Sequence, residues 1–366
     1  MGQKKSFGVP AKKDTVSQVG GSPVLHRDAY GGGTRTMMGR DSRAAPENKR
    51  TVWSMRAGVA DTVAAVAARE DPTISVRVAS AVAFHRRELE ATTGYGAIKD
   101  ETFELLEEIA QNKFVRQESL RCISAELSSR LKVTCPSTII SLINALAPVD
   151  EYLQRHCVNV SLLNGLIARW LGMEGLGVDN LILTGLMHDC GKALIPPRVL
   201  KAPRRLNLVE FEVVKMHPIN SYELLEEFPE GLRYAARYHH EKINGRGYPD
   251  SLSYDEIPLE ARITSISDVY DAMVSQRAYK HPSSPFRTLA TLSDLRDIEL
   301  DAEIVDVFIR NMPNELVDKP AMMSDGTVGI VRSIDPKDLE YPYVEINGTT
   351  IKSCADLYCT SMYHLE

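Results

Sequence analysis

Long hydrophobic runs are absent from this chain of 366 residues, and no stretch approaches the roughly 18 consecutive apolar residues of a membrane-spanning helix. The first residues, MGQKKSFGVPAKK, also lack the apolar block of a signal peptide. We therefore expect neither membrane insertion nor secretion.

Closely spaced cysteine pairs are absent as well. The six cysteines include no CxxC pair and show no dense spacing, so the sequence does not indicate a disulfide framework. Free thiols are typical of reducing compartments. The cysteine pattern therefore predicts a cytoplasmic protein.

An excess of positive charge is the third absence. The chain has 43 Lys and Arg against 49 Asp and Glu, a net charge of −6. Proteins that bind long nucleic acids gain most of their affinity by neutralising phosphates with Lys and Arg, so this partner class is not expected. A small phosphorylated ligand needs only a local basic group and stays open.

The apolar fraction of 43% is sufficient for a sizeable core, and the length suits two or three folded units. Residues 1–50 carry ten Lys and Arg against four Asp and Glu with almost no apolar periodicity, which predicts a disordered basic tail. It is either a solvated linker or a contact to an acidic partner or anionic lipid. Residues 51–135 have apolar side chains at helical spacing and predict an N-terminal helical region of unknown role.

Residues 136–315 are predicted to form a bundle of helices separated by polar loops with Pro and Gly. The expected helices are 137–147, 150–171, 179–190, 208–226, 230–240, 258–276 and 301–311. Residues 316–366 change to a β pattern, in which Asn347-Gly348 follows an apolar strand and indicates a hairpin. The expected fold is therefore all-α, with a small β-rich C-terminal appendage.

Histidines gather in one part of the chain. Five of the nine fall within an 85-residue window: His156, His188, His217, His239 and His240. Borderline divalent metals bind imidazole nitrogen and carboxylate oxygen, and one carboxylate can bridge two ions. The adjacent His188-Asp189 pair, which follows the apolar segment 181–187, can therefore offer one terminal and one bridging ligand.

Taken singly, each of these histidines would be interpreted as structural. As a set they differ, because each lies at the border between an apolar helical segment and a loop. Asp268 adds a carboxylate at the end of the apolar segment 263–268. A buried charge is costly unless it is paired, so a metal ion or a salt bridge is expected there.

Three strings of the sequence together resemble the signatures of the HD-GYP family. They are residues 188–192 (HDCGK), residues 239–249 (HHEKINGRGYP) and residues 268–273 (DVYDAM). Residues 155–158 (RHCV) and His217-Pro218 match in the same order. The resemblance covers roughly residues 140–315, about half of the chain.

The resemblance implies an HD-type helical bundle around a metal centre, with iron expected and manganese as the alternative. It assigns seven ligands: His156, His188, Asp189, His217, His239, His240 and Asp268. Asp189 would bridge the ions, and Lys192 would face the scissile phosphate. The implied catalytic residues are therefore Asp189 and Lys192.

A basic pair follows the last ligand. Arg277 and Lys280 stand one helical turn apart and match family positions that hold the phosphates of the substrate. Basic pairs at this spacing are usually solvated surface. The neighbouring Asp268 favours the phosphate-binding interpretation here.

The number of metals is expected to be two. Family members with three metals carry a glutamate four residues before the first histidine, where this chain has Tyr152. Glu151 is adjacent but would point about 100° away on a helix. Cys190 replaces the usual aliphatic residue of the His-Asp string, and a small buried hydrophobe should be tolerated there.

The residues Gly245, Arg246, Gly247, Tyr248 and Pro249 are predicted to form a loop whose glycines adopt backbone angles closed to other residues. Its Arg and Tyr side chains would be exposed and could contact a guanine or a partner protein. A loop folded only for packing is the alternative.

The function implied by the resemblance is hydrolysis of cyclic di-GMP to linear pGpG by a metal-bridging hydroxide, which leaves open whether GMP follows. One alternative is a catalytically idle module that binds nucleotide or a partner such as a diguanylate cyclase. Another is an HD hydrolase of a different substrate, such as a mononucleotide. The complete ligand set with Lys192 disfavours the first alternative, and the Gly-Tyr-Pro loop disfavours the second.

Overall fold

The structure, a computed structural model, describes residues 93–144, 152–202, 204–275 and 282–362. The predicted basic tail, residues 1–50, lies outside the described residues, as do residues 51–92 of the predicted N-terminal region. Within the described part, no helix is long and apolar enough to cross a membrane.

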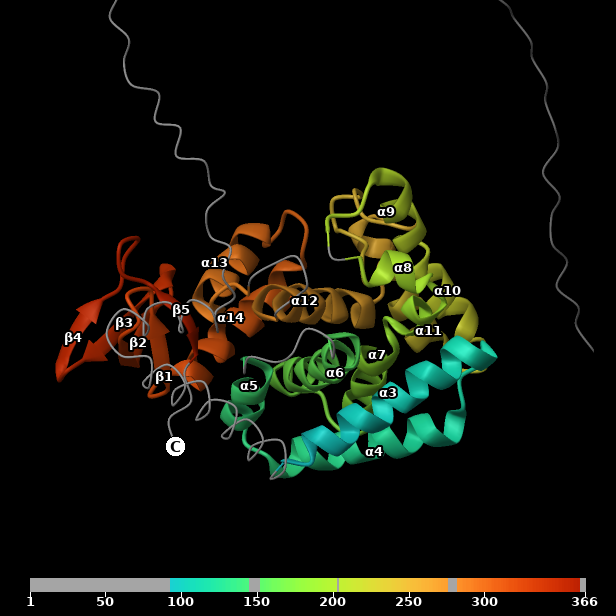
Figure 1. The fold of residues 1–366 in the computed structure, drawn as a ribbon, viewed down its shortest axis with the longest axis horizontal. Helices are drawn as coiled ribbons and strands as arrows, with labels where there is room; N and C mark the ends of the chain where they lie inside the picture. Colours follow the sequence, from blue (N-terminus) through green and yellow to red (C-terminus); the bar gives the residue numbers. More distant parts are fainter. Residues whose placement is uncertain (1–92, 145–151, 203, 276–281, 363–366) are drawn as a thin grey trace, which may run out of the picture. The chain divides into compact units, whose positions relative to one another are not determined.

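Two antiparallel helices open the described chain: α3 (Tyr95–Asn112) and α4 (Gln117–Val133). Helix α3 starts after Gly94, whose φ of 69° is left-handed. Both helices turn an apolar stripe inward, at residues 98, 105 and 109 of α3 and residues 120, 123, 127 and 131 of α4. They pack against each other and against the bundle (Figure 1). The predicted helical character is confirmed for the described part of this region, residues 93–135.

Helix α6 (Tyr152–Trp170) is the centre of the bundle, and every residue from Gln154 to Ala168 is buried. A helix buried all round must be enclosed by other helices. It is enclosed by α3, α4, α5 (Pro136–Asn144), α7 (Leu176–Met187), α12 (Leu259–Val274) and α14 (Ala302–Leu316). The polar residues of α6 must therefore find their hydrogen-bond partners inside the protein.

A series of short elements joins α7 to α12. They are η2 (Cys190–Leu194), α8 (Pro197–Leu200), α9 (Leu208–Val214), α10 (His217–Leu224), α11 (Glu230–Tyr238) and η3 (Tyr254–Glu256). The single helix expected over 208–226 is wrong, because α9 ends at Val214 and α10 begins at His217. Pro218 in the first turn of α10 lacks the N–H that a continuous helix would need there.

Helix α13 (Pro285–Leu295) was not expected from the sequence. The Ser284 hydroxyl accepts a hydrogen bond from the Arg287 amide at 3.2 Å and caps its first turn. Helix α14 is longer than expected and continues past Pro313 to Leu316. Both helices contribute buried apolar side chains to the main core.

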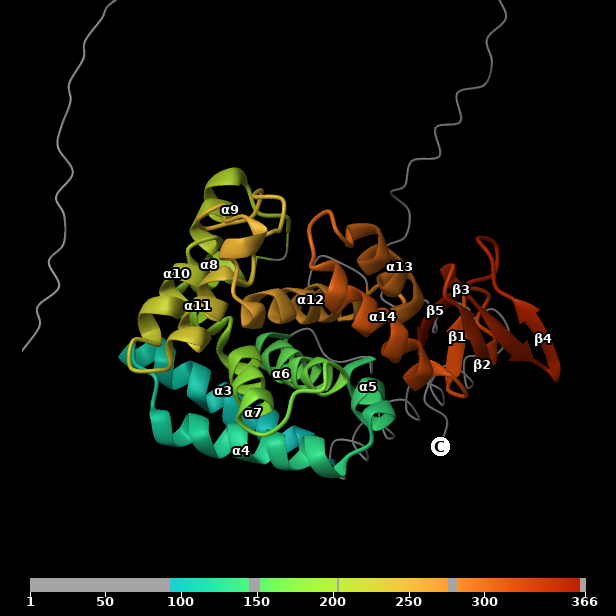
Figure 2. The same ribbon diagram turned by 180° about the vertical axis from the view of Figure 1, so that it is seen from behind.

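The predicted β-rich appendage is a five-stranded antiparallel sheet of order β4-β3-β2-β1-β5 (Figure 2). Its strands are β1 (Pro320–Met323), β2 (Val328–Asp335), β3 (Asp338–Ile346), β4 (Thr349–Lys352) and β5 (Cys359–Met362). The β3–β4 hairpin turns at Asn347 and Gly348, which both have positive φ, as the sequence predicted. Apolar residues of the sheet and of α3 and α4 belong to the same hydrophobic core as the bundle. The expected domain boundaries after residues 135 and 315 stay predictions.

Candidate metal centre

Helix ends deliver most of the candidate ligands. His188 follows the last residue of α7, His239 follows the last residue of α11, and His217 begins α10 just after α9. His156 lies in the buried α6 and Asp268 in α12. All of these side chains point to one place in the bundle.

The seven residues predicted as ligands form two adjoining groups. The first holds Asp189, His217, His239 and His240, and the second holds His156, His188 and Asp268. Within each group the candidate ligand atoms all lie within 4.8 Å of one another. Residues separated by up to 112 positions in the sequence, from 156 to 268, are thus brought together by the fold.

Asp189 lies between the two groups. Its Oδ1 is 3.1 Å from His217 Nε2 and 3.7 Å from His239 Nε2. Its Oδ2 is 3.4 Å from the Nε2 atoms of both His156 and His188. One carboxylate oxygen therefore faces each group.

The orientation of three histidines is fixed by carbonyl groups at the ends of helices. Such carbonyls have no partner within their own helix and only accept hydrogen bonds, so the ring Nδ1 must donate. The Nδ1–O distances are 2.7 Å from His188 to Gly185, 2.6 Å from His217 to Val214 and 2.9 Å from His239 to Ala236. Burial lowers the pKa of His217 and of His239, so in these two neutral rings the lone pair is left on Nε2, which faces the centre.

Some of these Nε2 atoms lie close to other hydrogen-bond acceptors, with no hydrogen atom available between them. His217 Nε2 lies 3.4 Å from His239 Nε2 and 3.1 Å from Asp189 Oδ1. Among the described residues, this buried Asp189 oxygen has no hydrogen-bond partner. Electron pairs that converge in a buried site need a cation between them, and imidazole and carboxylate are the donors that zinc, iron and manganese accept. The residues present therefore fit metal ions.

The pKa values of the histidines also indicate that the site suits a cation. Burial lowers the pKa of His239 well below its usual value and that of His240 to about 3, so both rings are neutral. Burial also disfavours the charge on His156, but its hydrogen bonds to Asp189, Asp268 and Asp271 outweigh this and raise its pKa to about 10. The cluster of buried carboxylates thus favours a positive charge among them.

Asp271 belongs to the candidate site by its contact with His156, but the sequence analysis did not assign it. It lies on α12 three residues after Asp268, and its Oδ2 accepts a hydrogen bond from His156 Nδ1 at 2.6 Å. This contact fixes the orientation of the His156 ring, as the helix carbonyls fix the orientation of the other three rings. The signal was the second Asp of the DVYDAM string, one helical turn from the first.

Lys192 and Gly191 follow the His-Asp pair in η2. The Lys192 ammonium contacts Asp189 Oδ2 directly and is partly exposed. A Cβ on Gly191 would lie only 2.2 Å from the His217 carbonyl oxygen, so this position needs glycine for α10 to approach. The Gly191 amide also donates to Ser221 Oγ at 2.8 Å.

The loop of residues 245–249 packs beside His240. The Tyr248 ring stacks on the His240 ring with centroids 4.7 Å apart and is half-buried rather than exposed, whereas Arg246 is exposed. Gly245 has a φ of 72°, which favours glycine. Gly247 instead allows close packing of the backbone, since a Cβ there would lie 2.4 Å from Glu241 Cα. The buried Glu241 carboxylate accepts hydrogen bonds from the amides of Asp250 and Leu252 and fixes the end of the loop.

The remaining predicted positions are only partly described. Tyr152 stacks on the His156 ring, with centroids 5.3 Å apart and planes at 18°. Glu151, Arg277 and Lys280 lie outside the described residues, so the phosphate-binding role of the basic pair stays a prediction.

The chain is similar to proteins of known family and name. Residues 140–304 match the family described as HD domain. The chain is 34% identical over 212 residues to the cyclic di-GMP phosphodiesterase response regulator RpfG of Xanthomonas campestris, covering 56% of each chain. It is 30% identical to the cyclic di-GMP phosphodiesterase PA4108 of Pseudomonas aeruginosa, covering 58% of this chain and 51% of that one.

A third relative carries a different substrate in its name. The 3'3'-cGAMP-specific phosphodiesterase 2 of Vibrio cholerae is 28% identical over 185 residues, covering 50% of this chain and 35% of that one. The chain spans about half the length of the first curated relatives it matches. Residues 140–304 are thus similar to HD domains, and the His and Asp clusters and these relatives support the resemblance to the HD-GYP family.

Proposed function

We propose that this chain is a metal-dependent phosphodiesterase that hydrolyses cyclic di-GMP to linear pGpG. The observation that carries the proposal is the pair of adjoining ligand groups with the Asp189 carboxylate between them. Two ions a short distance apart suit the cleavage of a phosphodiester. The relatives named as cyclic di-GMP phosphodiesterases support the same substrate.

Metal ions bound here would activate water for attack on phosphorus and neutralise charge that develops on the phosphoryl oxygens. The protein's part is to hold them. His188, His217 and His239 present their Nε2 atoms to the centre from rings that the helix carbonyls keep in place. Asp189 supplies a shared carboxylate, and the ligand set suits iron, with manganese as the alternative.

The substrate is proposed to enter on the side of His240, Asp268 and Lys192. Their side chains are 23%, 12% and 16% exposed, whereas those of the other five ligands are at most 1% exposed. The Lys192 ammonium lies at this opening and is placed to pair with a phosphate oxygen. Arg277 and Lys280 follow Asp268 in the sequence and are proposed to hold the second phosphate.

The choice of bases is the second part of the proposal. Relatives include proteins named for cyclic di-GMP and one named for 3'3'-cGAMP, so both dinucleotides belong in the test. The exposed Arg246, in the loop whose Tyr248 stacks on His240, is proposed to contact a guanine or a partner such as a diguanylate cyclase. We propose a cytoplasmic location, which suits the six free cysteines.

The test is a product assay with protein purified anaerobically and supplied with iron or manganese. Cyclic di-GMP, 3'3'-cGAMP and a mononucleotide are offered separately, and products are separated by chromatography. We expect linear pGpG from cyclic di-GMP, with the rate lost on chelation and restored by metal. Cleavage of the mononucleotide alone, or binding without turnover in the metal-loaded protein, would refute the proposal.

A further inference from the structure

A chain of buried hydrogen bonds leads from helix α3 to the metal centre. The Tyr95 hydroxyl donates to Asn159 Oδ1 at 2.6 Å, and Asn159 Nδ2 donates to Asp271 Oδ1 at 2.6 Å. Asp271 Oδ2 in turn accepts from His156 Nδ1, also at 2.6 Å. All four side chains are at most 2% exposed, so water does not compete for these bonds.

The directions of these bonds are set by the groups themselves. The Asp271 carboxylate only accepts, so Asn159 must turn its NH2 group toward it and its oxygen away. That oxygen then needs a donor, which Tyr95 supplies. The other acceptor near the Tyr95 hydroxyl, the Arg155 carbonyl, is farther away at 3.5 Å.

Loss of the Tyr95 hydroxyl would leave the buried Asn159 oxygen without this donor. A flip of the amide would not repair the loss, because it would set the Asn159 oxygen against the Asp271 carboxylate. The other donor to Asp271 Oδ1 is Ser275 Oγ, at 3.1 Å. Movement of Asn159 therefore acts on the carboxylate that holds the His156 ring.

We propose that Tyr95 is a positioning residue for the metal centre, acting through Asn159 and Asp271 on the orientation of His156. The inference rests on the proposed function in that His156 is taken as a metal ligand. Tyr95 lies outside residues 140–304, which match the HD domain family. A helix that precedes the matched domain thus completes the support of its metal site.

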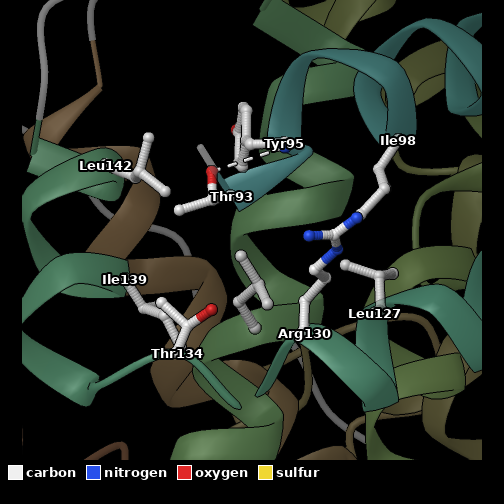
Figure 3. A pocket seen from close by; sticks show the side chains of 9 residues that line it. Thr93, Tyr95, Ile98, Leu127, Arg130, Thr134, Ile139 and Leu142 are labelled. Carbon is white, nitrogen blue, oxygen red and sulfur yellow. Dashed lines mark hydrogen bonds between the residues drawn. The ribbon is translucent and has the colours of Figure 1, made fainter. Parts of the chain in front are cut away.

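Tyr95 lies where a movement of α3 would affect the hydrogen bonds that lead to His156. Its side chain borders a hollow between α3, α4, α5 and α6, lined by apolar residues such as Leu127 and Ile139 and by the Arg130 side chain (Figure 3). The Tyr95 amide also donates to Thr93 Oγ1 at 3.4 Å, just before α3 begins. A displacement of this end of α3 would move the first donor of the series.

The chain offers a matched control. Tyr270 is also fully buried, and its hydroxyl donates to the amide oxygen of Asn144 at 3.2 Å. The Asn144 NH2 group donates to the Ile140 carbonyl at 2.8 Å and so leads away from the metal centre. Tyr95→Phe and Tyr270→Phe therefore remove the same kind of bond, with and without a link to His156.

The experiment measures Mn²⁺ affinity of the chelator-stripped full-length chain by titration. Removing a partner that orients a metal ligand typically costs about 10–100-fold in metal affinity. Tyr95 acts two hydrogen bonds farther out, so we expect Tyr95→Phe to weaken Mn²⁺ binding by about 3–10-fold. Tyr270→Phe should bind Mn²⁺ as the wild type does. Adding Tyr95→Phe to Asn159→Ala should cause less than about a twofold further loss, because the effect passes through Asn159.

A second measurement uses metal-free protein with ¹⁵N-labelled histidine. The Nδ1 proton of His156, bound to Asp271, should shift or broaden in Tyr95→Phe and stay unchanged in Tyr270→Phe. Should Tyr95→Phe not fold, Asn159→Ala with Asn144→Ala as control tests the same series. Wild-type Mn²⁺ affinity and an unchanged His156 signal in Tyr95→Phe would overturn the inference. If the wild type binds neither Mn²⁺ nor Fe²⁺, the proposed metal centre fails, and the His156 signal still decides the role of Tyr95.

Discussion

Replacement of Asp189 by Asn is the sharpest test of the proposed centre. The substitution keeps the shape of the side chain but removes its charge and turns one oxygen into an NH2 donor. That carboxylate is 1% exposed and faces Nε2 atoms of both ligand groups. The change therefore affects both proposed ions at once.

The size of the effect follows from the burial. Removing one partner of a buried charge pair costs about 3–5 kcal/mol, which corresponds to roughly 10²- to 10⁴-fold in metal affinity. The new NH2 group can donate to a histidine lone pair, such as that on His217 Nε2, and so fill the place of a cation. The metal-free variant should therefore stay folded while it loses metal.

The assay combines elemental analysis of anaerobically purified protein, hydrolysis of cyclic di-GMP and thermal unfolding. Metal content and turnover should fall together. Asp179→Asn is the matched control, because Asp179 is likewise an aspartate, lies on α7 and accepts a hydrogen bond from Ser128 at 2.7 Å, away from the cluster. If Asp189→Asn kept wild-type metal content and rate, the assigned centre would be wrong.

Further outcomes follow from the same geometry. Elemental analysis should approach two metals per chain, because Tyr152 stands where a third metal would need a carboxylate; a reproducible value of three would point to Glu151 instead. Asp271→Asn should weaken Mn²⁺ binding by about 10–100-fold, more than Tyr95→Phe, because it removes the direct partner of a ligand; equal Mn²⁺ affinities of the two variants would contradict this. Arg277→Ala should lower kcat/KM by roughly ten- to hundredfold at unchanged metal content, since a charge-assisted bond to phosphate contributes about 1.5–3 kcal/mol. Arg277→Lys should restore part of this, and normal kinetics for Arg277→Ala would exclude it from the substrate site.

The sequence alone predicted the helical bundle, the β-rich end and the set of candidate ligands. Helical periodicity and turn residues are local signals, which is why α6, α12 and the Asn347-Gly348 hairpin were predicted. The candidate ligands were recognisable because metal chemistry limits the residue types and the motif strings fix their order. The break between α9 and α10 was missed, although Pro218 carried the signal.

Only the tertiary structure decided how those ligands act. The two oxygens of Asp189 face different groups because α6, α7, α10 and α11 converge, and no local pattern encodes that arrangement. The buried hydrogen bonds from Tyr95 to His156 join residues up to 176 positions apart in the sequence, from 95 to 271. Buried polar groups need hydrogen-bond partners among the residues that packing brings close to them. The sequence therefore specified the types of donor and acceptor, and the tertiary structure determined which of them pair.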